Sequence, residues 1–260
     1  MTDTTILTER RGHVLIVTIN RPEARNAVNA AVHIGIGTAL EEAENDSEIR
    51  AVVITGAGDK SFCAGADLVA LSRGESLQPD DPAQQAWGFA GMVSHPISKP
   101  VIAAVNGVAI TGGFELALAC GILVASTTAR FADTHQRVGV IPGWGLSQKL
   151  SRIVGPSRAK EMAFSGRFVS AEQASQWGLV SRAVPPEALM ADVMTLAGEI
   201  AEVPAAFLAD YKRLVDEGYG MPFAEAMALE ADWSKRHNSA IAVTDLEARR
   251  AGVQARGRSR

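Results

Sequence analysis

The segment that decides the fold is Asn106-Gly107-Val108-Ala109-Ile110-Thr111-Gly112-Gly113-Phe114-Glu115-Leu116. An apolar run rich in β-branched residues, 101–105, precedes it, and a helix-forming stretch continues from it. The same order occurs earlier, where the run 51–54 leads to Ser61-Phe62-Cys63-Ala64-Gly65-Ala66-Asp67-Leu68. Each segment predicts a strand, a glycine turn and a helix, so two turns can point free backbone N–H groups into one crevice. Two such donors aimed at one carbonyl oxygen would form an oxyanion hole.

The rest of the chain predicts an α/β core followed by helices. Residues 6–10 and 14–19 are strand-like and predict a hairpin, and residues 29–44 carry apolar side chains at helical spacing. Residues 121–125 and 129–132 predict further strands, so strands and helices alternate as in α/β proteins. Beyond residue 143 the sequence is mostly helical. We expect a core over residues 1–198 and a helical region over 199–260, which packs either on a neighbouring subunit or on its own chain.

Composition narrows the classes of function. A hydrophobic content of 47% suffices for a large core, and a net charge of −4 gives no support for nucleic-acid binding. No apolar run reaches the roughly 18–20 residues that cross a bilayer, and the first residues do not resemble a signal peptide, so we expect no membrane association. Cys63 and Cys120 have no spacing typical of a metal or redox site, which favours buried thiols and a cytoplasmic protein.

Glycine turns after strands also bind nucleotide phosphates, so a nucleotide site is an alternative interpretation of these segments. The glycines fall at 56, 58 and 65 in one segment and at 107, 112 and 113 in the other. Neither set gives Gly-x-Gly-x-x-Gly, and no Gly-Lys-Ser/Thr follows. A dinucleotide or P-loop site is therefore poorly supported.

Four segments in order resemble the crotonase (enoyl-CoA hydratase/isomerase) superfamily. They are Arg21-Pro22-Glu23-Ala24-Arg25-Asn26-Ala27, then 64–68, 112–116, and Gly139-Val140-Ile141-Pro142-Gly143-Trp144-Gly145 with Gln148-Lys149-Leu150. The resemblance extends from about residue 14 to 185, while the C-terminal part matches loosely. It implies an α/β fold with a crotonase-type repeated ββα core and a C-terminal helical region that forms a homotrimer or homohexamer.

The resemblance also implies an acyl-CoA thioester as substrate. The backbone N–H groups of Ala66 and Gly112 would bind the thioester oxygen. The expected contacts with CoA and substrate are Ala24, Arg25, Ala64, Asp67, Leu68, Gly113 and Trp144, where Trp144 either narrows the acyl pocket or covers an edge of the core. The family often has a lysine where this chain has Val69, and a lysine-arginine pair near Ala255-Arg256. Arg25 and Arg256 are therefore only candidates for phosphate contacts.

The acid and base groups decide the reaction. Hydration of an enoyl thioester needs a base for the attacking water and an acid for C2. The first family glutamate matches Glu115, and the second position, six residues before Ile141, holds His135 instead. Histidine could act as a base near neutral pH, and Asp133 could share its face if the segment is extended.

These residues predict enoyl-CoA hydratase-like chemistry, with Glu115 as acid/base and His135 as a possible second group. The alternatives are an enoyl-CoA double-bond isomerase and an acyl-CoA-binding protein without turnover. No metal or redox cofactor is implied, because CoA enters as part of the substrate.

Overall fold

The computed structural model describes residues 5–239, 250 and 254. Contacts divide the chain into two compact units, Met1–Ala209 and Asp210–Arg260. The boundary expected after residue 198 falls inside helix α9 (Leu189–Ala201), whose apolar face packs on the sheet of the first unit. None of the helices in the described part of the chain is both long and apolar enough to span a membrane.

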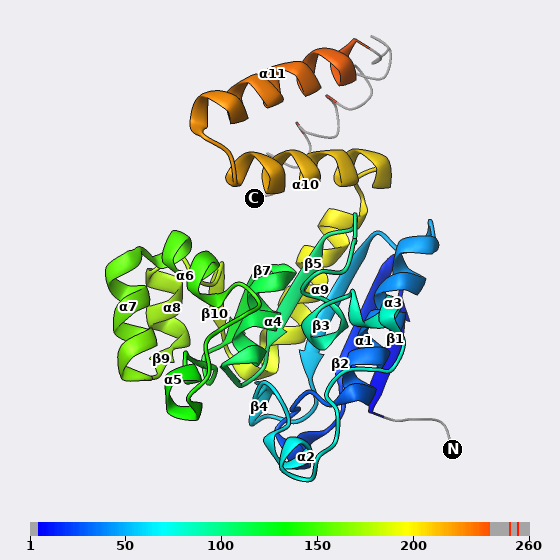
Figure 1. The fold of residues 1–260 in the computed structure, drawn as a ribbon. Helices are drawn as coiled ribbons and strands as arrows, with labels where there is room; N and C mark the ends of the chain where they lie inside the picture. Colours follow the sequence, from blue (N-terminus) through cyan, green and yellow to red (C-terminus); the bar gives the residue numbers. More distant parts are fainter. Residues whose placement is uncertain (1–4, 240–249, 251–253, 255–260) are drawn as a thin grey trace. The chain divides into compact units, whose positions relative to one another are not determined.

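The larger sheet of the first unit is six-stranded and mostly parallel (Figure 1). Its strands in spatial order are β1 (Ile6–Arg11), β2 (Val14–Ile19), β3 (Ala51–Gly56), β5 (Val101–Val105), β7 (Gly121–Ser126) and β10 (Arg182–Val184). Strands β1 and β2 form the predicted antiparallel hairpin, and every other neighbouring pair is parallel. The parallel order follows from the helices and second strands that connect successive members.

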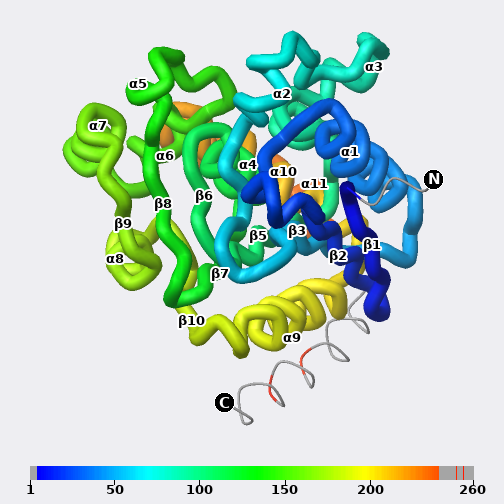
Figure 2. The backbone as a smooth tube through the Cα atoms, turned by 90° about the horizontal axis from the view of Figure 1, so that it is seen from below, coloured from blue at the N-terminus to red at the C-terminus, as the bar shows by residue number. Residues whose placement is uncertain are grey.

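A four-stranded sheet receives the second strand of each repeat. Its order is β4 (Ser61–Cys63), β6 (Val108–Ile110), β8 (Arg130–Ala132) and β9 (Val169–Ser170), and Figure 2 shows β6, β8 and β9 side by side. Strand β9 alone is antiparallel to its neighbour. Three successive units of the chain, β3-β4-α2, β5-β6-α4 and β7-β8-α5, therefore each give one strand to each sheet.

Helices cover both faces of the larger sheet. Alternate residues of β3 explain why, since Val52 and Ile54 join the core beneath α1 (Ala30–Asn45) and α4 (Gly112–Cys120), while Ala51 and Val53 face α9. Figure 2 shows α9 on the side of the strands opposite α1 and α4. The predicted apolar face of α1 is buried at every position, namely Val32, Ile36, Leu40 and Ala43.

The remaining helices of the first unit are mostly short. They are η1 (Pro22–Ala24), α2 (Leu68–Ser72), α3 (Pro82–Gln85), η2 (Phe89–Gly91), α5 (His135–Val138), α6 (Leu146–Val154), α7 (Pro156–Ser165), α8 (Ala171–Gln176) and η3 (Pro186–Ala188). The predicted cap of α8 is present, because the Ser170 side chain accepts a hydrogen bond from the Gln173 amide at 3.2 Å. The polar segment 73–81 contains no helix or strand, and α3 begins directly after it.

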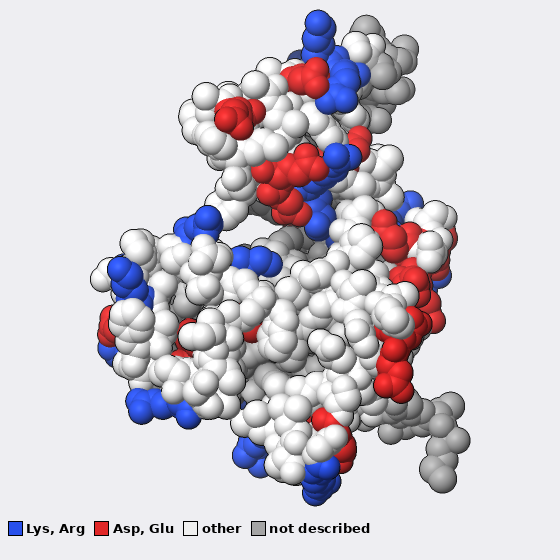
Figure 3. Space-filling view, in the orientation of Figure 1, with Lys and Arg blue, Asp and Glu red and all other residues white. Residues whose placement is uncertain are grey.

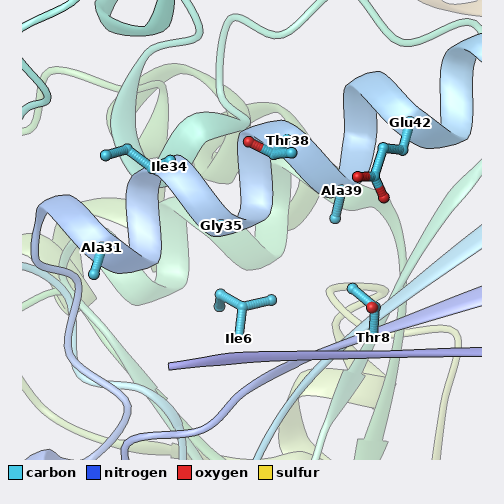
Figure 4. A pocket seen from close by; sticks show the side chains of 8 residues that line it. All are labelled: Ile6, Thr8, Ala31, Ile34, Gly35, Thr38, Ala39 and Glu42. Atoms are coloured by element: carbon cyan, nitrogen blue, oxygen red, sulfur yellow. The ribbon is translucent and has the colours of Figure 1, made fainter. Parts of the chain in front are cut away.

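A groove of about 430 Å³ lies between the edge strand β1 and α1 (Figure 4). Ile6 and Thr8 form its strand side, and residues 31–42 of α1 form the other side. Gly35 allows the close packing here, since a Cβ at that position would lie 2.5 Å from Cγ1 of Ile6. None of the residues predicted for substrate binding or catalysis lines this groove.

The second unit contains α11 (Phe223–Asn238) and most of α10 (Ala205–Tyr219), which begins in the first unit. Neither helix has a buried residue. Large apolar side chains at Val215, Tyr219 and Phe223 are 56%, 61% and 82% exposed, respectively.

Candidate active site

The two predicted glycine turns lie against each other. Gly65 follows β4 in a left-handed conformation (φ +88°), and a Cβ on it would lie 3.0 Å from the Gly112 nitrogen. A Cβ on Gly112 would in turn lie 3.5 Å from the Gly65 Cα. Segments almost fifty residues apart in the sequence therefore meet with backbone facing backbone, where side chains would keep them apart.

The amides of Ala66 and Gly112 are the donors predicted for an oxyanion hole. Val28 pairs with both neighbours of Ala66, through Val28 N to Gly65 O at 2.7 Å and Asp67 N to Val28 O at 2.9 Å. Because successive N–H groups of an extended segment alternate in direction, the Ala66 N–H points away from Val28. Gly112 is the first residue of the nine-residue helix α4. Within the described residues, neither amide donates a hydrogen bond, so both remain available to an acceptor.

The start of α4 is tightly constrained. A Cβ on Gly113 would lie 2.0 Å from the carbonyl oxygen of Cys63, so only glycine fits there. Thr111, which precedes the helix, has φ +53°, an unfavourable conformation for a β-branched residue. Its hydroxyl is hydrogen-bonded to that of Thr134, and its amide donates to Ala132 O at 3.2 Å. These contacts fix the beginning of α4 against the end of β8.

Glu115 lies in the first turn of α4 and is completely buried. Its Oε1 accepts hydrogen bonds from the amides of Trp144 at 2.8 Å and Leu146 at 3.2 Å. Its Oε2 accepts none from the described residues and lies 3.5 Å from Nε2 of His135. One oxygen therefore anchors the carboxylate, while the other faces the imidazole and remains available for proton transfer.

His135 is not in an extended segment, because β8 ends at Ala132 and α5 begins at His135 itself. Asp133 still reaches it across this turn. Its Oδ1 accepts from the His135 amide at 3.1 Å and from Nδ1 at 2.8 Å, and both side chains are buried. Burial lowers the pKa of His135, but the hydrogen bonds that its ring donates toward Asp133 and Glu115, together with the charges of these two carboxylates, outweigh it and raise the pKa to about 9. The imidazole is therefore a cation at neutral pH, between two carboxylates.

Trp144 is half-buried, and its ring stacks on Phe89 with the ring centroids 4.1 Å apart and the planes 13° from parallel. Phe89 comes from η2 and lies directly over Gly112, since a Cβ on Gly112 would lie 2.7 Å from the Phe89 ring. The aromatic pair thus lies between the predicted oxyanion donor and the segment that holds Glu115. Sequence reasoning included Trp144 but missed Phe89, because the irregular stretch around it has no periodic pattern.

Asp67 has a structural task in addition to its predicted contact with CoA. Its carboxylate caps α2 by accepting from the Val69 and Ala70 amides and pairs with Arg21 at 2.8 Å. Burial raises the pKa of Asp67, but the hydrogen bonds to Ala70 and Arg21 and the Arg21 charge lower it overall. Arg21 was missed as a partner, although it opens the Arg21–Ala27 motif. The ion pair holds this turn against the start of α2.

The other residues predicted to contact CoA lie on the same two turns. The Ala64 amide donates to the carbonyl of Arg25 at 3.1 Å, which brings Ala24 and Arg25 beside Ala64. Arg25 is exposed, and Leu68, at the start of α2, is 51% exposed. Figure 3 shows Lys and Arg side chains beside acidic ones at its lower edge, in the region where Figure 1 places α2. Arg256 lies outside the described residues.

Two sheets built from ββα repeats, with a glycine turn before α4, define an α/β protein of the crotonase type. A family model described as enoyl-CoA hydratase/isomerase matches residues 9–255. A short-chain-enoyl-CoA hydratase of Clostridium acetobutylicum is 36% identical over 231 residues, which cover 87% of each chain. The chain therefore belongs to the enoyl-CoA hydratase/isomerase family, and the predicted resemblance is confirmed.

Solved structures agree with this assignment. The structure of a carnitinyl-CoA dehydratase from Mycobacterium avium is 44% identical, with a TM-score of 0.78 over 90% of both chains. A probable enoyl-CoA hydratase/isomerase from Mycobacterium abscessus is 32% identical, with a TM-score of 0.83 over 98% of this chain and 97% of its own. The predicted fold class is confirmed by these similarities.

Proposed function

We propose that the protein is an enoyl-CoA hydratase that adds water across the C2–C3 double bond of an acyl-CoA thioester. The observation that carries the proposal is the buried Glu115 carboxylate, whose free Oε2 faces the His135 cation. Curated relatives named as hydratases, at 35–36% identity over most of the chain, support the same reaction. They do not favour an isomerase or a non-catalytic binding protein.

The thioester oxygen would be bound by the amides of Ala66 and Gly112. As water attacks C3, negative charge builds on this oxygen, and fixed amide dipoles stabilise it without reorganising. The N-terminus of α4 adds a favourable dipole. Loss of one such donor typically raises the barrier by about 3–4 kcal/mol. The free state of both amides and the contact between the two turns support this assignment.

Glu115 and His135 would then handle the protons. Glu115 accepts a proton from the attacking water, and His135, as the cation, supplies one to C2. Only protons and water move, so the proposed reaction needs no metal or redox cofactor. The acyl group would pass the stacked rings of Phe89 and Trp144, because Phe89 lies against Gly112 and the backbone amide of Trp144 holds Glu115. Gly113 gives the close backbone approach, while Ala24, Arg25, Ala64, Asp67 and Leu68 form the turns proposed to receive CoA.

An assay with two substrates tests the proposal. Wild-type protein should hydrate crotonyl-CoA, and Glu115→Gln should lower kcat by about 10²–10⁴-fold, the usual contribution of an acid/base group. His135→Ala is assayed beside it, and Glu187→Gln in η3 serves as control because that carboxylate is exposed. An unchanged rate in Glu115→Gln contradicts the mechanism. Turnover of a 3-enoyl-CoA alone would indicate an isomerase, and acyl-CoA binding without turnover would indicate a carrier.

We also propose that the protein acts in the cytoplasm as a trimer or a pair of trimers. Burial raises the pKa of both thiols, Cys63 and Cys120, to about 12, and they are free, as expected in a reducing compartment. The exposed apolar side chains of α10 and α11 support association through the Asp210–Arg260 unit. Cell fractionation tests the first statement, and light scattering tests the second.

A further inference from the structure

We propose that Asp133 is a positioning residue: it holds His135 as a cation with Nε2–H directed at Glu115, so that histidine is the proton donor of the pair. This inference rests on the proposed hydratase function for its catalytic consequence. The underlying geometry does not depend on that function, and it can be tested separately.

The orientation of the imidazole follows from two hydrogen bonds to one oxygen. Oδ1 of Asp133 accepts from both the amide and the Nδ1 of His135, at 3.1 and 2.8 Å. A carboxylate offers only acceptors, so Nδ1 must carry a proton in this contact. The ring cannot rotate without breaking a bond within a buried site, where the exposed fractions are 3% for Asp133 and 4% for His135. Nε2 is left as the only ring nitrogen that can face the substrate.

The surroundings keep that nitrogen protonated. The charged groups acting on His135 are Asp133, from its own turn, and Glu115, from α4. Among the residues that the structure describes, no other titratable group contributes to the raised pKa of His135. The backbone amides of Trp144 and Leu146, just before and at the start of α6, donate their hydrogen bonds to Glu115 and not to the imidazole. Asp133 thus supplies the negative charge that is not itself consumed during the reaction.

The resulting proton cycle balances. The water oxygen bonds to C3 as its proton passes to Glu115 Oε2; the C2–C3 π electrons form a new C2–H bond with the proton from His135 Nε2. The product is a 3-hydroxyacyl-CoA, with Glu115 protonated and His135 neutral. Glu115 then returns its proton to Nε2, only 3.5 Å away, which restores the pair without exchange with solvent. A neutral imidazole protonated only at Nδ1 could not begin this cycle, because Nε2 would have no proton to give to C2.

Nuclear magnetic resonance of the wild-type protein gives the first test. Histidines labelled with ¹⁵N are titrated, and the His135 signal is assigned from its absence in His135→Gln among the five histidines. We expect both ring nitrogens to be protonated at pH 7, with a pKa near 9. A neutral His135 ring at pH 7 would overturn the proposal. This measurement needs no substrate and no variant of Asp133.

The second test uses Asp133→Asn, which keeps the shape and an acceptor oxygen but removes the charge. We expect the pKa of His135 to fall, the alkaline limb of the kcat profile to move to lower pH, and kcat at pH 8 to fall by about 10²-fold with KM little changed. Asp133→Glu should restore part of the rate, and Glu187→Gln should behave as wild type. An unchanged profile and His135 pKa in Asp133→Asn would refute the positioning role.

The two proposals fail in different ways. Wild-type protein that does not hydrate crotonyl-CoA refutes the hydratase function, whatever the titration gives. Wild-type protein that hydrates crotonyl-CoA with a neutral His135 at pH 7 supports the function and refutes the role of Asp133.

Discussion

At the scale of single residues, the site consists of three buried ionisable side chains, with His135 between Glu115 and Asp133. Burying an ionised group is costly unless its hydrogen-bonding capacity is met, and here Glu115 Oε2 is left without a hydrogen bond from the described residues. A purely structural carboxylate would be expected to have both oxygens satisfied. The unsatisfied oxygen faces a cation, which is the arrangement that a proton-transfer site requires.

The raised pKa of His135 makes folding stability depend on pH. The folded protein keeps this proton up to about pH 9, whereas the unfolded chain loses it near 6.5. The stabilising contribution is therefore complete below pH 6.5 and is lost as the pH rises to 9.

Urea unfolding between pH 6 and 9.5 measures this contribution. The difference in unfolding free energy between wild type and His135→Gln should shrink as the pH rises through this window. His13→Gln, near the β1–β2 turn, is the control and should parallel the wild type. A wild-type minus His135→Gln difference that is constant with pH would contradict the assignment.

At the scale of elements, helix α4 is placed by backbone contacts at its first turn. Gly113 packs on the carbonyl of Cys63 with no space for a methyl group, so Gly113→Ala should destabilise the protein by about 1–3 kcal/mol through overpacking. Gly198→Ala in α9 is the matched control, because a Cβ there meets nothing within 4 Å. It should be neutral or stabilising, since alanine favours helix by about 1 kcal/mol. Thermal unfolding of both variants distinguishes them, and equal effects would contradict the close contact.

The stacked rings of Phe89, in η2, and Trp144, just before α6, should limit the length of the acyl group that the site accepts. Trp144→Ala removes one ring of the pair and leaves the backbone amide that holds Glu115. We expect the ratio of kcat/KM for a decenoyl-CoA to that for crotonyl-CoA to rise about tenfold, a typical effect of pocket contacts. Trp177→Ala, which removes a tryptophan from the C-terminal cap of α8, is the control. An unchanged ratio in Trp144→Ala would place the acyl chain elsewhere.

At the scale of the whole molecule, helices α10 and α11, which make up most of the described part of the Asp210–Arg260 unit, contain no buried residue. Phe223→Asp, at a side chain that is 82% exposed, should leave the first unit folded but lower the mass of the assembly. Phe164→Asp on α7 makes the same change at a side chain that is 77% exposed and is expected to keep the mass. Light scattering after gel filtration gives the result. A monomeric wild type would contradict the proposed trimer.

Much of the architecture could be predicted, since the β-branched runs at 51–54 and 101–105 form central strands and the glycine turns meet beside α4. The predictions from sequence were weaker where contacts are not periodic. Asp133 reaches His135 through a tight turn instead of along a strand, because the segment stops being extended at Ala132. Phe89 reaches Gly112 from an irregular stretch, and no local pattern predicts such a contact.

The backbone amides of Trp144 and Leu146 hold the Glu115 carboxylate in place. The position of this carboxylate is therefore independent of the side chain that contacts the acyl group. The main-chain donor at position 144 is present for every residue except proline. Substitutions there could therefore change which chain lengths are accepted while the reacting carboxylate stays in place. The range of substrates could therefore change during evolution while the catalytic geometry is retained.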